Sequence, residues 1–239
     1  MGVDLAWGER RRSGIAVLEP GGRVVAEGWA LGLAEIAAAV RRHDGGGAVL
    51  GVDAPLVVTV TSGRRDCEGR VQAAYGRRGA GPHPSNLTLL RGRVRAMELV
   101  RSLGYTWRLE EPAGRTGRWA IEVFPHPALV ELAGLDRALR YKRGPLTLRR
   151  EGLLALLGVL QRLGCVGPTL LALGSRLGSL RGGGLKDFED LADAHVCALV
   201  ARHWWRHGRI GTRVFGDEQG GAILVPVPVH EGLWDTASV

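Results

Sequence analysis

Short apolar runs occupy the first quarter of the chain, and their spacing predicts strands and a helix. A break at Pro20-Gly21-Gly22 between two of these runs indicates a hairpin. Between Leu33 and Val40 the apolar residues follow the i, i+3, i+4, i+7 spacing of one helix face, and three glycines then end the helix. The elements predicted here are strands at Gly2–Trp7, Gly14–Leu18 and Arg23–Trp29, a helix over Leu33–Val40, and a strand buried on both faces at Ala48–Val52.

Periodicity is lost over residues 57–86, which are rich in Gly, Arg and Pro, and returns afterwards. A connection of this length tends to be functional in a compact domain, so we expect an arginine-rich insertion there. The elements predicted beyond it are a helix over Leu87–Leu103, a strand over Arg118–Phe124 that Pro125 ends, a helix over Leu146–Leu163, a long helix over Lys186–Trp205 and one short strand near Ala222–Val227.

This order of elements predicts an α/β fold with a mixed sheet covered by helices. The first three strands form a meander, and a right-handed crossover then places the fourth strand parallel to the first. We expect five strands in the order 3-2-1-4-5, flanked by helices, with the insertion after strand 4. Residues 1–239 are predicted to form a single domain with residues 57–86 as its insertion.

The composition is that of a globular protein, with 45% apolar and 23% charged residues, and it argues against extensive disorder. The formal net charge is +8, and arginine supplies nearly all of the positive charge because Lys142 and Lys186 are the only lysines. The planar guanidinium suits phosphate oxygens, so a polyanionic partner is reasonable. A basic, solvated surface explains the same charge equally well.

The three cysteines are widely spaced and form no C-x-x-C pair, which argues against a disulfide framework or a thiolate zinc site. The first residues contain no apolar signal segment, and no apolar run approaches the roughly 18 residues of a membrane span. We therefore expect a cytoplasmic protein without a membrane partner.

Five acidic residues lie in or beside predicted regular elements. Asp4 lies inside the first strand, Asp53 directly follows the fourth, and Glu122 lies in the fifth. Asp190 and Asp193 lie three residues apart on the long helix near the C-terminus. Strands disfavour Asp, and a buried carboxylate is costly unless it is paired or bound to a metal. Each acid alone also has an ordinary explanation at a turn, a strand end or the first turns of a helix.

Together the acids predict a metal site. If strands 1 and 4 are parallel neighbours, Asp4 and Asp53 meet at one end of the sheet, and the i, i+3 spacing lets Asp190 and Asp193 project toward the same point. Crowded carboxylates repel, and Mg²⁺ or Mn²⁺ relieves this repulsion through the oxygen ligands that hard ions prefer. We expect Asp4, Asp53 and Asp193 as catalytic metal ligands, with Glu122 and Asp190 as auxiliary ligands.

Six short segments, in order along nearly the whole chain, carry a family resemblance. They are Gly2-Val3-Asp4, Gly51-Val52-Asp53-Ala54-Pro55-Leu56, Arg65-Asp66-Cys67-Glu68, Glu122-Val123-Phe124-Pro125, Tyr141-Lys142 and Asp190-x-x-Asp193-Ala194. In these segments the chain resembles the domain of unknown function 429 family, whose members are predicted ribonuclease H-like nucleases. The resemblance implies a ribonuclease H-like core with acids on the first strand, the fourth strand and the last helix. This fold also carries resolvases, transposases and sugar kinases, so the fold alone does not fix the chemistry.

The segment from residue 64 to residue 95 contains eight arginines and two acids, an excess of six positive charges. A lid that binds phosphate and a solvated loop are both consistent with it. In the first case Arg64 and Arg65, the arginines nearest Asp53 in sequence, contact the substrate, and Lys142 is a further phosphate contact.

The function that these features favour is metal-dependent hydrolysis of nucleic acid. One alternative is a phosphotransferase or nucleotide binder of the sugar-kinase and actin type, which is disfavoured because no Gly/Ser/Thr-rich phosphate turn follows Asp4 or Asp53. The other alternative is a non-catalytic nucleic-acid-binding protein. Trp7 is a candidate for stacking on a base, or else part of the core. His126 and His195 receive no role.

Overall fold

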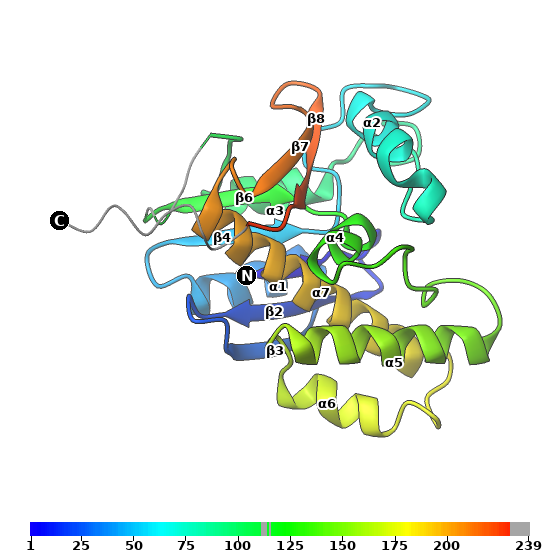
Figure 1. Cartoon of the computed structure of the whole chain (residues 1–239). Coiled ribbons are helices and arrows are strands. Elements are labelled where there is room, and N and C mark those ends of the chain that lie inside the picture. The colour runs from blue at the N-terminus through cyan, green and yellow to red at the C-terminus, as the bar shows by residue number, and fades with distance from the viewer. Residues whose placement is uncertain (111–113, 115, 230–239) are drawn as a thin grey trace.

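In the computed structural model, which describes residues 1–110, 114 and 116–229, six strands form one mixed sheet (Figure 1). They are β1 (Gly2–Asp4), β2 (Arg12–Leu18), β3 (Val24–Leu31), β4 (Ala48–Val52), β5 (Thr106–Trp107) and β6 (Arg118–Glu122). Their order across the sheet is β3-β2-β1-β4-β6-β5. β1 pairs antiparallel with β2 and parallel with β4, and β4 pairs parallel with β6. The protein is therefore an α/β protein with a sheet of parallel and antiparallel strands.

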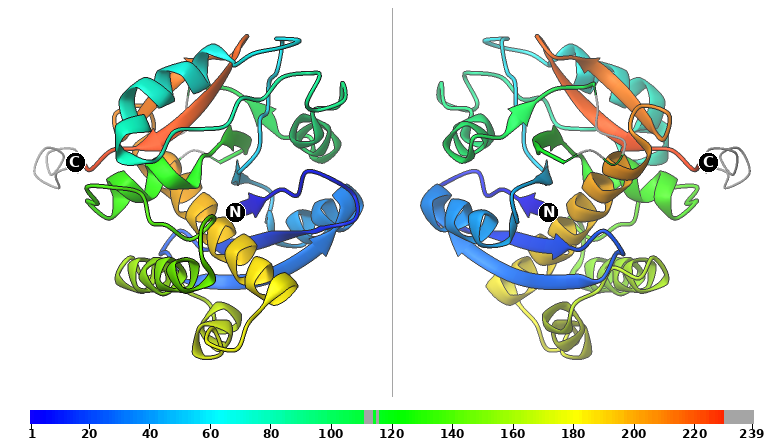
Figure 2. Two further views of the ribbon diagram at one scale, coloured as in Figure 1. Left: turned by 90° about the vertical axis from the view of Figure 1, so that its right-hand side faces the viewer. Right: turned by 90° about the vertical axis from the view of Figure 1, so that its left-hand side faces the viewer.

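Helices cover both faces of this sheet (Figures 1 and 2). They are α1 (Gly32–His43), α2 (Asp66–Tyr75), α3 (Arg95–Leu103), α4 (Pro125–Leu132), α5 (Leu146–Arg162), α6 (Pro168–Ser175) and α7 (Gly182–His207). α1 and α3 pack on one face in a core that contains Ile36, Leu50 and Leu99. α7 crosses the other face, and α4, α5 and α6 pack against it in a second core. No helix in the described part of the chain is both long and apolar enough to span a bilayer.

Three glycines allow α7 to approach the sheet closely. Gly2 lies on β1, Gly14 on β2 and Gly51 on β4. A Cβ atom at any of them would lie between 2.0 and 2.5 Å from a backbone carbonyl oxygen of α7, which is far inside van der Waals contact. Because these positions carry no side chain, α7 can lie this close to β1, β2 and β4.

The sheet differs from the sequence prediction in the number of its strands. A sixth strand, β5, pairs with β6 at the sheet edge, and its two residues are too few to give a periodic pattern. The single β-like segment expected near the end of the chain is one arm of an antiparallel pair, β7 (Thr212–Asp217) and β8 (Gly221–Pro226). The bridge between Val123 and Leu224 connects this pair to the end of β6.

The insertion over residues 57–86 is more ordered than its sequence indicates. It contains α2, followed by a short 3₁₀ turn at Gly76–Arg78. Cys67, Val71 and Tyr75, spaced four residues apart on α2, are buried against β7 and β8. The Gly and Arg residues around this short apolar face obscured its helical period. The basic insertion is therefore largely packed against the hairpin near the C-terminus.

The helix expected over Leu87–Leu103 begins only at Arg95. Arg91 and Gly92 have φ angles of 53° and 74°, in the left-handed region that a right-handed helix excludes. The preceding residues form turns instead, so the predicted apolar period extended past the true start of the helix.

Candidate functional site

Asp4 and Asp53 lie side by side where two parallel strands end. Asp4 is the last residue of β1, and Asp53 directly follows β4. Val3 pairs with Val52, and the Asp53 N–H donates to the Val3 carbonyl at 2.9 Å, which extends the ladder by one step. Because the strands run in the same direction, their carboxyl ends bring both acids to one edge of the sheet.

α7 adds a third carboxylate to this edge. Asp193 lies where α7 crosses β1 and β4, and its side chain is fully buried. Asp4, Asp53 and Asp193 each offer a carboxylate oxygen within 4.8 Å of the other two. The sequence prediction that three acids from separate elements meet at one point is therefore confirmed. We call these residues the aspartate cluster.

Burial and mutual repulsion oppose the ionisation of Asp4 and Asp53. Burial, followed by the carboxylates of Asp53 and Asp193, raises the pKa of Asp4 well above its usual value. Burial likewise raises the pKa of Asp53 to about 6, although Lys142 opposes the shift. A cation among these oxygens would stabilise the charged form of both.

Lys142 supplies a positive charge at the aspartate cluster. Its Nζ lies 2.8 Å from Asp193 Oδ2 and 3.6 Å from Asp53 Oδ2. Although burial alone would lower it, these two carboxylates raise the pKa of Lys142 well above its usual value. The Tyr141 hydroxyl donates to the other oxygen of Asp193, Oδ1, at 2.7 Å. In this conformation the Lys142 ammonium, predicted to contact phosphate, is bound to the acids, while its side chain lines the cleft.

Asp190 lies on the same face of α7 but pairs with a different lysine. Lys186 Nζ lies 2.5 Å from Asp190 Oδ1 and 2.7 Å from Glu189 Oε1. Asp190 is not one of the three acids whose oxygens lie mutually within 4.8 Å. Asp190, expected as an auxiliary ligand, thus forms an ion pair at the rim of the aspartate cluster and lies beside Asp4.

Glu122 and Arg65, both predicted to belong to the functional site, bind each other. Arg65 Nη1 and Nη2 donate to the two carboxylate oxygens of Glu122 at 2.9 and 2.6 Å, and the Leu56 N–H donates to Glu122 at 2.9 Å. Arg65 also donates to Glu68 at 2.9 Å. Glu122, expected as an auxiliary metal ligand, has both oxygens occupied by other donors. Arg65, expected to bind substrate, is only 2% exposed and is not among the described residues that line the cleft.

A cleft of about 1690 Å³ opens over Asp4 and Asp53. Among the described residues that line it, the basic ones come chiefly from two segments, the connection between β1 and β2 and the connection between α4 and α5. The arginines and lysines of the cleft are Arg10, Arg11, Arg12, Arg78, Arg137, Arg140, Lys142, Arg143 and Lys186. Trp7 also lines the cleft, with 68% of its surface exposed, so it is not a core residue.

The arginines of the insertion contribute little to this cleft. Arg78 lines it, but neither Arg64 nor Arg65 is among the described lining residues. Arg64 is exposed and donates to the Pro82 carbonyl at 3.5 Å. The insertion thus borders the cleft through Arg78 and through the residues that follow it, including Pro82, His83 and Ser85, while α2 itself is packed on the hairpin.

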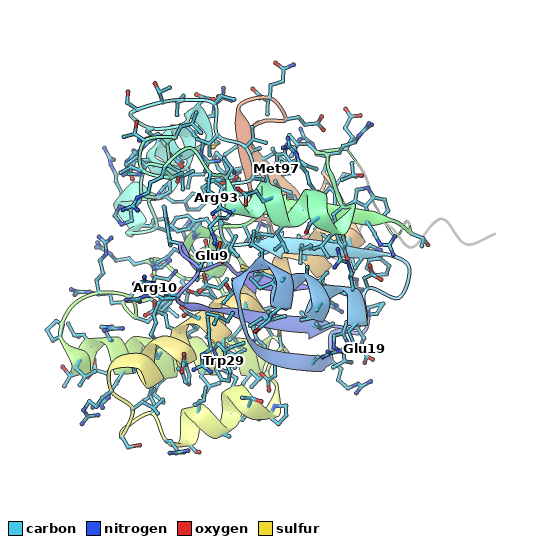
Figure 3. The ribbon with its side chains drawn as sticks, turned by 180° about the vertical axis from the view of Figure 1, so that it is seen from behind. Glu9, Arg10, Glu19, Trp29, Arg93 and Met97 are labelled. Atoms are coloured by element: carbon cyan, nitrogen blue, oxygen red, sulfur yellow. The ribbon has the colours of Figure 1, made fainter. Side chains whose placement is uncertain are left out.

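The segment that carries Trp7 and Arg10 is attached to the α3 region by Glu9. Glu9 forms ion pairs with Arg95 and, at 3.9 Å, with Arg93, and Figure 3 shows Glu9 and Arg93 close together beside Arg10. Arg10 and Arg11 form no ion pair within the described residues, so their guanidinium groups are available to an anion in the cleft.

The two histidines named from sequence have different surroundings. His126 lines the cleft and stacks between Phe124 and Tyr141, with ring centroids 5.5 and 5.0 Å away. Burial, followed by the Lys142 charge, lowers the pKa of His126 to about 4, so it is neutral near pH 7. His195 is fully buried, 3.1 Å from Glu27, and contributes nothing to the cleft.

The pairing of both lysines with acids at this edge of the sheet was not predicted from the sequence. The signal was present in the composition, since Lys142 and Lys186 are the only lysines among 32 basic residues. Almost all other basic residues are arginines, yet the two residues that lie beside these buried carboxylates are lysines. A compact point charge fits between closely spaced oxygens better than a planar fork does.

These features define an α/β protein with an aspartate cluster at the carboxyl ends of parallel strands, beneath a basic cleft. The chain belongs to the family described as protein of unknown function (DUF429), whose model matches residues 2–219. Comparison with curated proteins and with solved structures gives no match.

Proposed function

We propose that this protein is a metal-dependent nuclease of ribonuclease H-like fold, which hydrolyses phosphodiester bonds with Mg²⁺ or Mn²⁺. The observation that carries the proposal is the meeting of Asp4, Asp53 and Asp193, from two strands and one helix, beneath a cleft lined with arginine. The family resemblance implies this distribution of acids over the first strand, the fourth strand and the last helix.

The donor set fits a hard divalent cation. Carboxylate oxygens are the ligands that Mg²⁺ and Mn²⁺ prefer, and opposite ligands of an octahedral Mg²⁺ lie about 4 Å apart, twice its bond length. The cluster oxygens lie within 4.8 Å of one another, so a small closure of side chains suffices. Asp4, Asp53 and Asp193 would hold the ion, which would activate water and stabilise the leaving oxygen.

The remaining residues of the cleft suit a polyanionic substrate. Arg10 and Arg11 on one side, and Arg140 and Arg143 on the other, are exposed and line the cleft. Guanidinium groups bind phosphate oxygens through paired hydrogen bonds and thereby orient a backbone. The neutral imidazole of His126 packs beneath Tyr141, whose hydroxyl orients Asp193. These residues position the substrate and the cluster.

The test is a cleavage assay on labelled single-stranded and duplex DNA and RNA, with Mg²⁺, with Mn²⁺ and with chelator. We expect cleavage with either metal and none with chelator. Binding without cleavage under all metal conditions would instead favour the non-catalytic nucleic-acid-binding alternative. A phosphotransferase of the sugar-kinase type would release phosphate from ATP, and the segment after Asp4, Leu5-Ala6-Trp7-Gly8-Glu9, lacks the Gly/Ser/Thr-rich turn that it needs.

A further inference from the structure

Lys142 occupies the position that a metal ion at the aspartate cluster would need. Its ammonium lies between Asp193 Oδ2 and Asp53 Oδ2, at 2.8 and 3.6 Å. The second oxygen of Asp193, Oδ1, accepts the Tyr141 hydroxyl at 2.7 Å. Oδ2 is therefore the oxygen of Asp193 that does not bind Tyr141, and Lys142 is bound to it.

We propose that Lys142 is the resident counter-ion of the metal-free cluster and that metal binding displaces its ammonium into the cleft. This inference rests on the metal centre of the proposed function. A divalent ion bonded to both Oδ2 atoms at roughly 2.1 Å would overlap the volume of Nζ. Two cations that share the same oxygens also repel, so the ammonium and the metal exclude each other.

Burial explains why the cluster needs a counter-ion. The Asp193 side chain is fully buried, and a buried carboxylate without a positive partner is strongly destabilising. Lys142 provides that partner from the connection between α4 and α5, which is outside the sheet and α7. The folded, metal-free protein thus holds its acids together without an ion.

The side chain of Lys142 also has a way out of the cluster. It is 28% exposed and lines the cleft, whereas the carboxylate it contacts is 0% exposed. Lysine carries its charge on a flexible four-carbon stem, so the ammonium can move while the backbone stays in place. Once displaced, it lies among Arg140 and Arg143, where a substrate phosphate is the next available anion.

Lys186 provides an internal comparison. It binds Asp190 and Glu189, neither of which belongs to the aspartate cluster. Its ammonium forms no ion pair with a cluster carboxylate among the described residues, although the Asp4 carboxylate acts on its charge, so metal binding should perturb Lys186 less than Lys142. Because the chain contains only these two lysines, a sample labelled with ¹⁵N-lysine gives at most two side-chain ammonium signals.

The first experiment measures Mn²⁺ affinity by electron paramagnetic resonance without nucleic acid, for the wild type, Lys142→Gln and Arg209→Gln. Arg209 is exposed and does not line the cleft, so its variant loses the same unit of charge away from the cluster. We expect Lys142→Gln to bind Mn²⁺ at least tenfold more tightly than the wild type, and Arg209→Gln to match the wild type within twofold. Circular dichroism establishes that each variant is folded.

The second experiment needs no variant for its readout and keeps the proposal testable if Lys142→Gln does not fold. Mg²⁺ is added to the ¹⁵N-lysine-labelled wild type, and the two ammonium signals are followed by NMR, with Lys186→Gln used only for assignment. We expect the Lys142 signal to shift or disappear through faster hydrogen exchange, and the Lys186 signal to change less.

The outcomes separate this inference from the proposed function. If Lys142→Gln binds Mn²⁺ as tightly as the wild type or more weakly, metal does not displace the Lys142 ammonium, although the metal centre is retained. The same conclusion follows if Mg²⁺ binds and the Lys142 signal does not move. No Mn²⁺ binding by any of the three proteins overturns both the metal centre and the exchange.

Discussion

The guanidinium of Arg65 binds both carboxylate oxygens of Glu122, 57 residues away, at 2.9 and 2.6 Å. Glu68 binds the same guanidinium, and all three side chains are nearly inaccessible to solvent. This buried network attaches the start of α2 to the end of β6, directly beside β4, the strand that Asp53 follows. It fixes the insertion to the sheet.

Replacement of Arg65 should therefore unfold the protein readily. Arg65→Met leaves Glu68 and Glu122 buried without their positive partner, and we expect a loss of about 3–5 kcal/mol in the free energy of unfolding, measured in urea. Arg70→Met is the matched control, because Arg70 forms an exposed ion pair with Asp66 and should cost less than about 1 kcal/mol. Equal losses in the two variants would contradict a structural role for the network.

Loss of one ligand of the aspartate cluster should abolish metal-dependent cleavage while the fold persists. Asp4→Asn keeps the size of the side chain and removes a charge that burial already disfavours. We expect cleavage to fall by more than about a hundredfold, with nucleic-acid binding largely unchanged. Asp66→Asn, at an exposed acid on α2, should retain full activity. Undiminished turnover in Asp4→Asn would falsify the proposed role of Asp4.

Metal affinity should fall in mildly acidic solution. Metal binding requires the carboxylate form, and the pKa of Asp53 is raised to about 6. Below that pH, each displaced proton reduces Mn²⁺ affinity by about tenfold per pH unit. A Mn²⁺ titration followed by electron paramagnetic resonance between pH 8 and pH 5 measures this slope. An affinity that stays constant across the range would rule out Asp53 as a titrating ligand.

The raised pKa of Asp53 also makes the stability of the metal-free protein depend on pH. Stability falls as pH rises, whereas metal affinity increases. The folded pKa of Asp53 exceeds its ordinary value of 3.8, so its contribution to stability is fully present below that value and is lost as pH rises through about 6. Thermal unfolding of wild type and Asp53→Asn, compared at pH 4.5 and pH 7, isolates the contribution. We expect the variant to gain stability over the wild type at pH 7, and much less at pH 4.5.

Trp7 should contribute to the binding of unpaired bases. It is 68% exposed beside Arg10 and Arg11, in the segment that follows Asp4. Stacking of a base on an aromatic ring is worth about 1–3 kcal/mol, so Trp7→Ala should weaken single-stranded binding roughly 5- to 150-fold in a fluorescence anisotropy assay. Trp7→Phe should retain most of the affinity. Ile210→Ala is the control, since Ile210 is equally exposed but does not line the cleft.

The arginines of the same segment should determine the salt dependence of binding. Arg10→Gln with Arg11→Gln removes two phosphate contacts, which should lower the slope of log K against log salt by about 1.4 for a single strand. Arg209→Gln, an exposed arginine outside the cleft, should leave the slope unchanged. An unchanged slope in the double variant would mean that these two side chains do not touch the substrate backbone.

The approach of the acids was predictable because it follows from local patterns. The unbroken apolar run of β4 marks a strand buried on both faces, and such strands pair in parallel through a helical crossover. That pairing alone places Asp4 beside Asp53. Asp193 could be added because helical spacing puts it on one face with Asp190.

The partners of the charged residues were not predictable in the same way. Nothing in the local sequence of Arg65 indicates that Glu122 faces it, since that contact depends on how α2 packs against the hairpin of β7 and β8. The same holds for Lys142, whose position follows from the path of the chain between α4 and α5. Net charge likewise predicted a basic surface but not which arginines line the cleft.

The spacing between the ligands depends on residues that are not ligands, namely Gly2, Gly14 and Gly51. The distance from α7 to the sheet helps to set the distance from Asp193 to Asp4 and Asp53, and it depends on three positions that carry no functional group. A single methyl group at one of them, on the hydrophobic side of the sheet, would widen the carboxylate triangle without touching an acid. The packing of the core thus determines the spacing of the three carboxylates, and with it the ionic radius that the centre can accept.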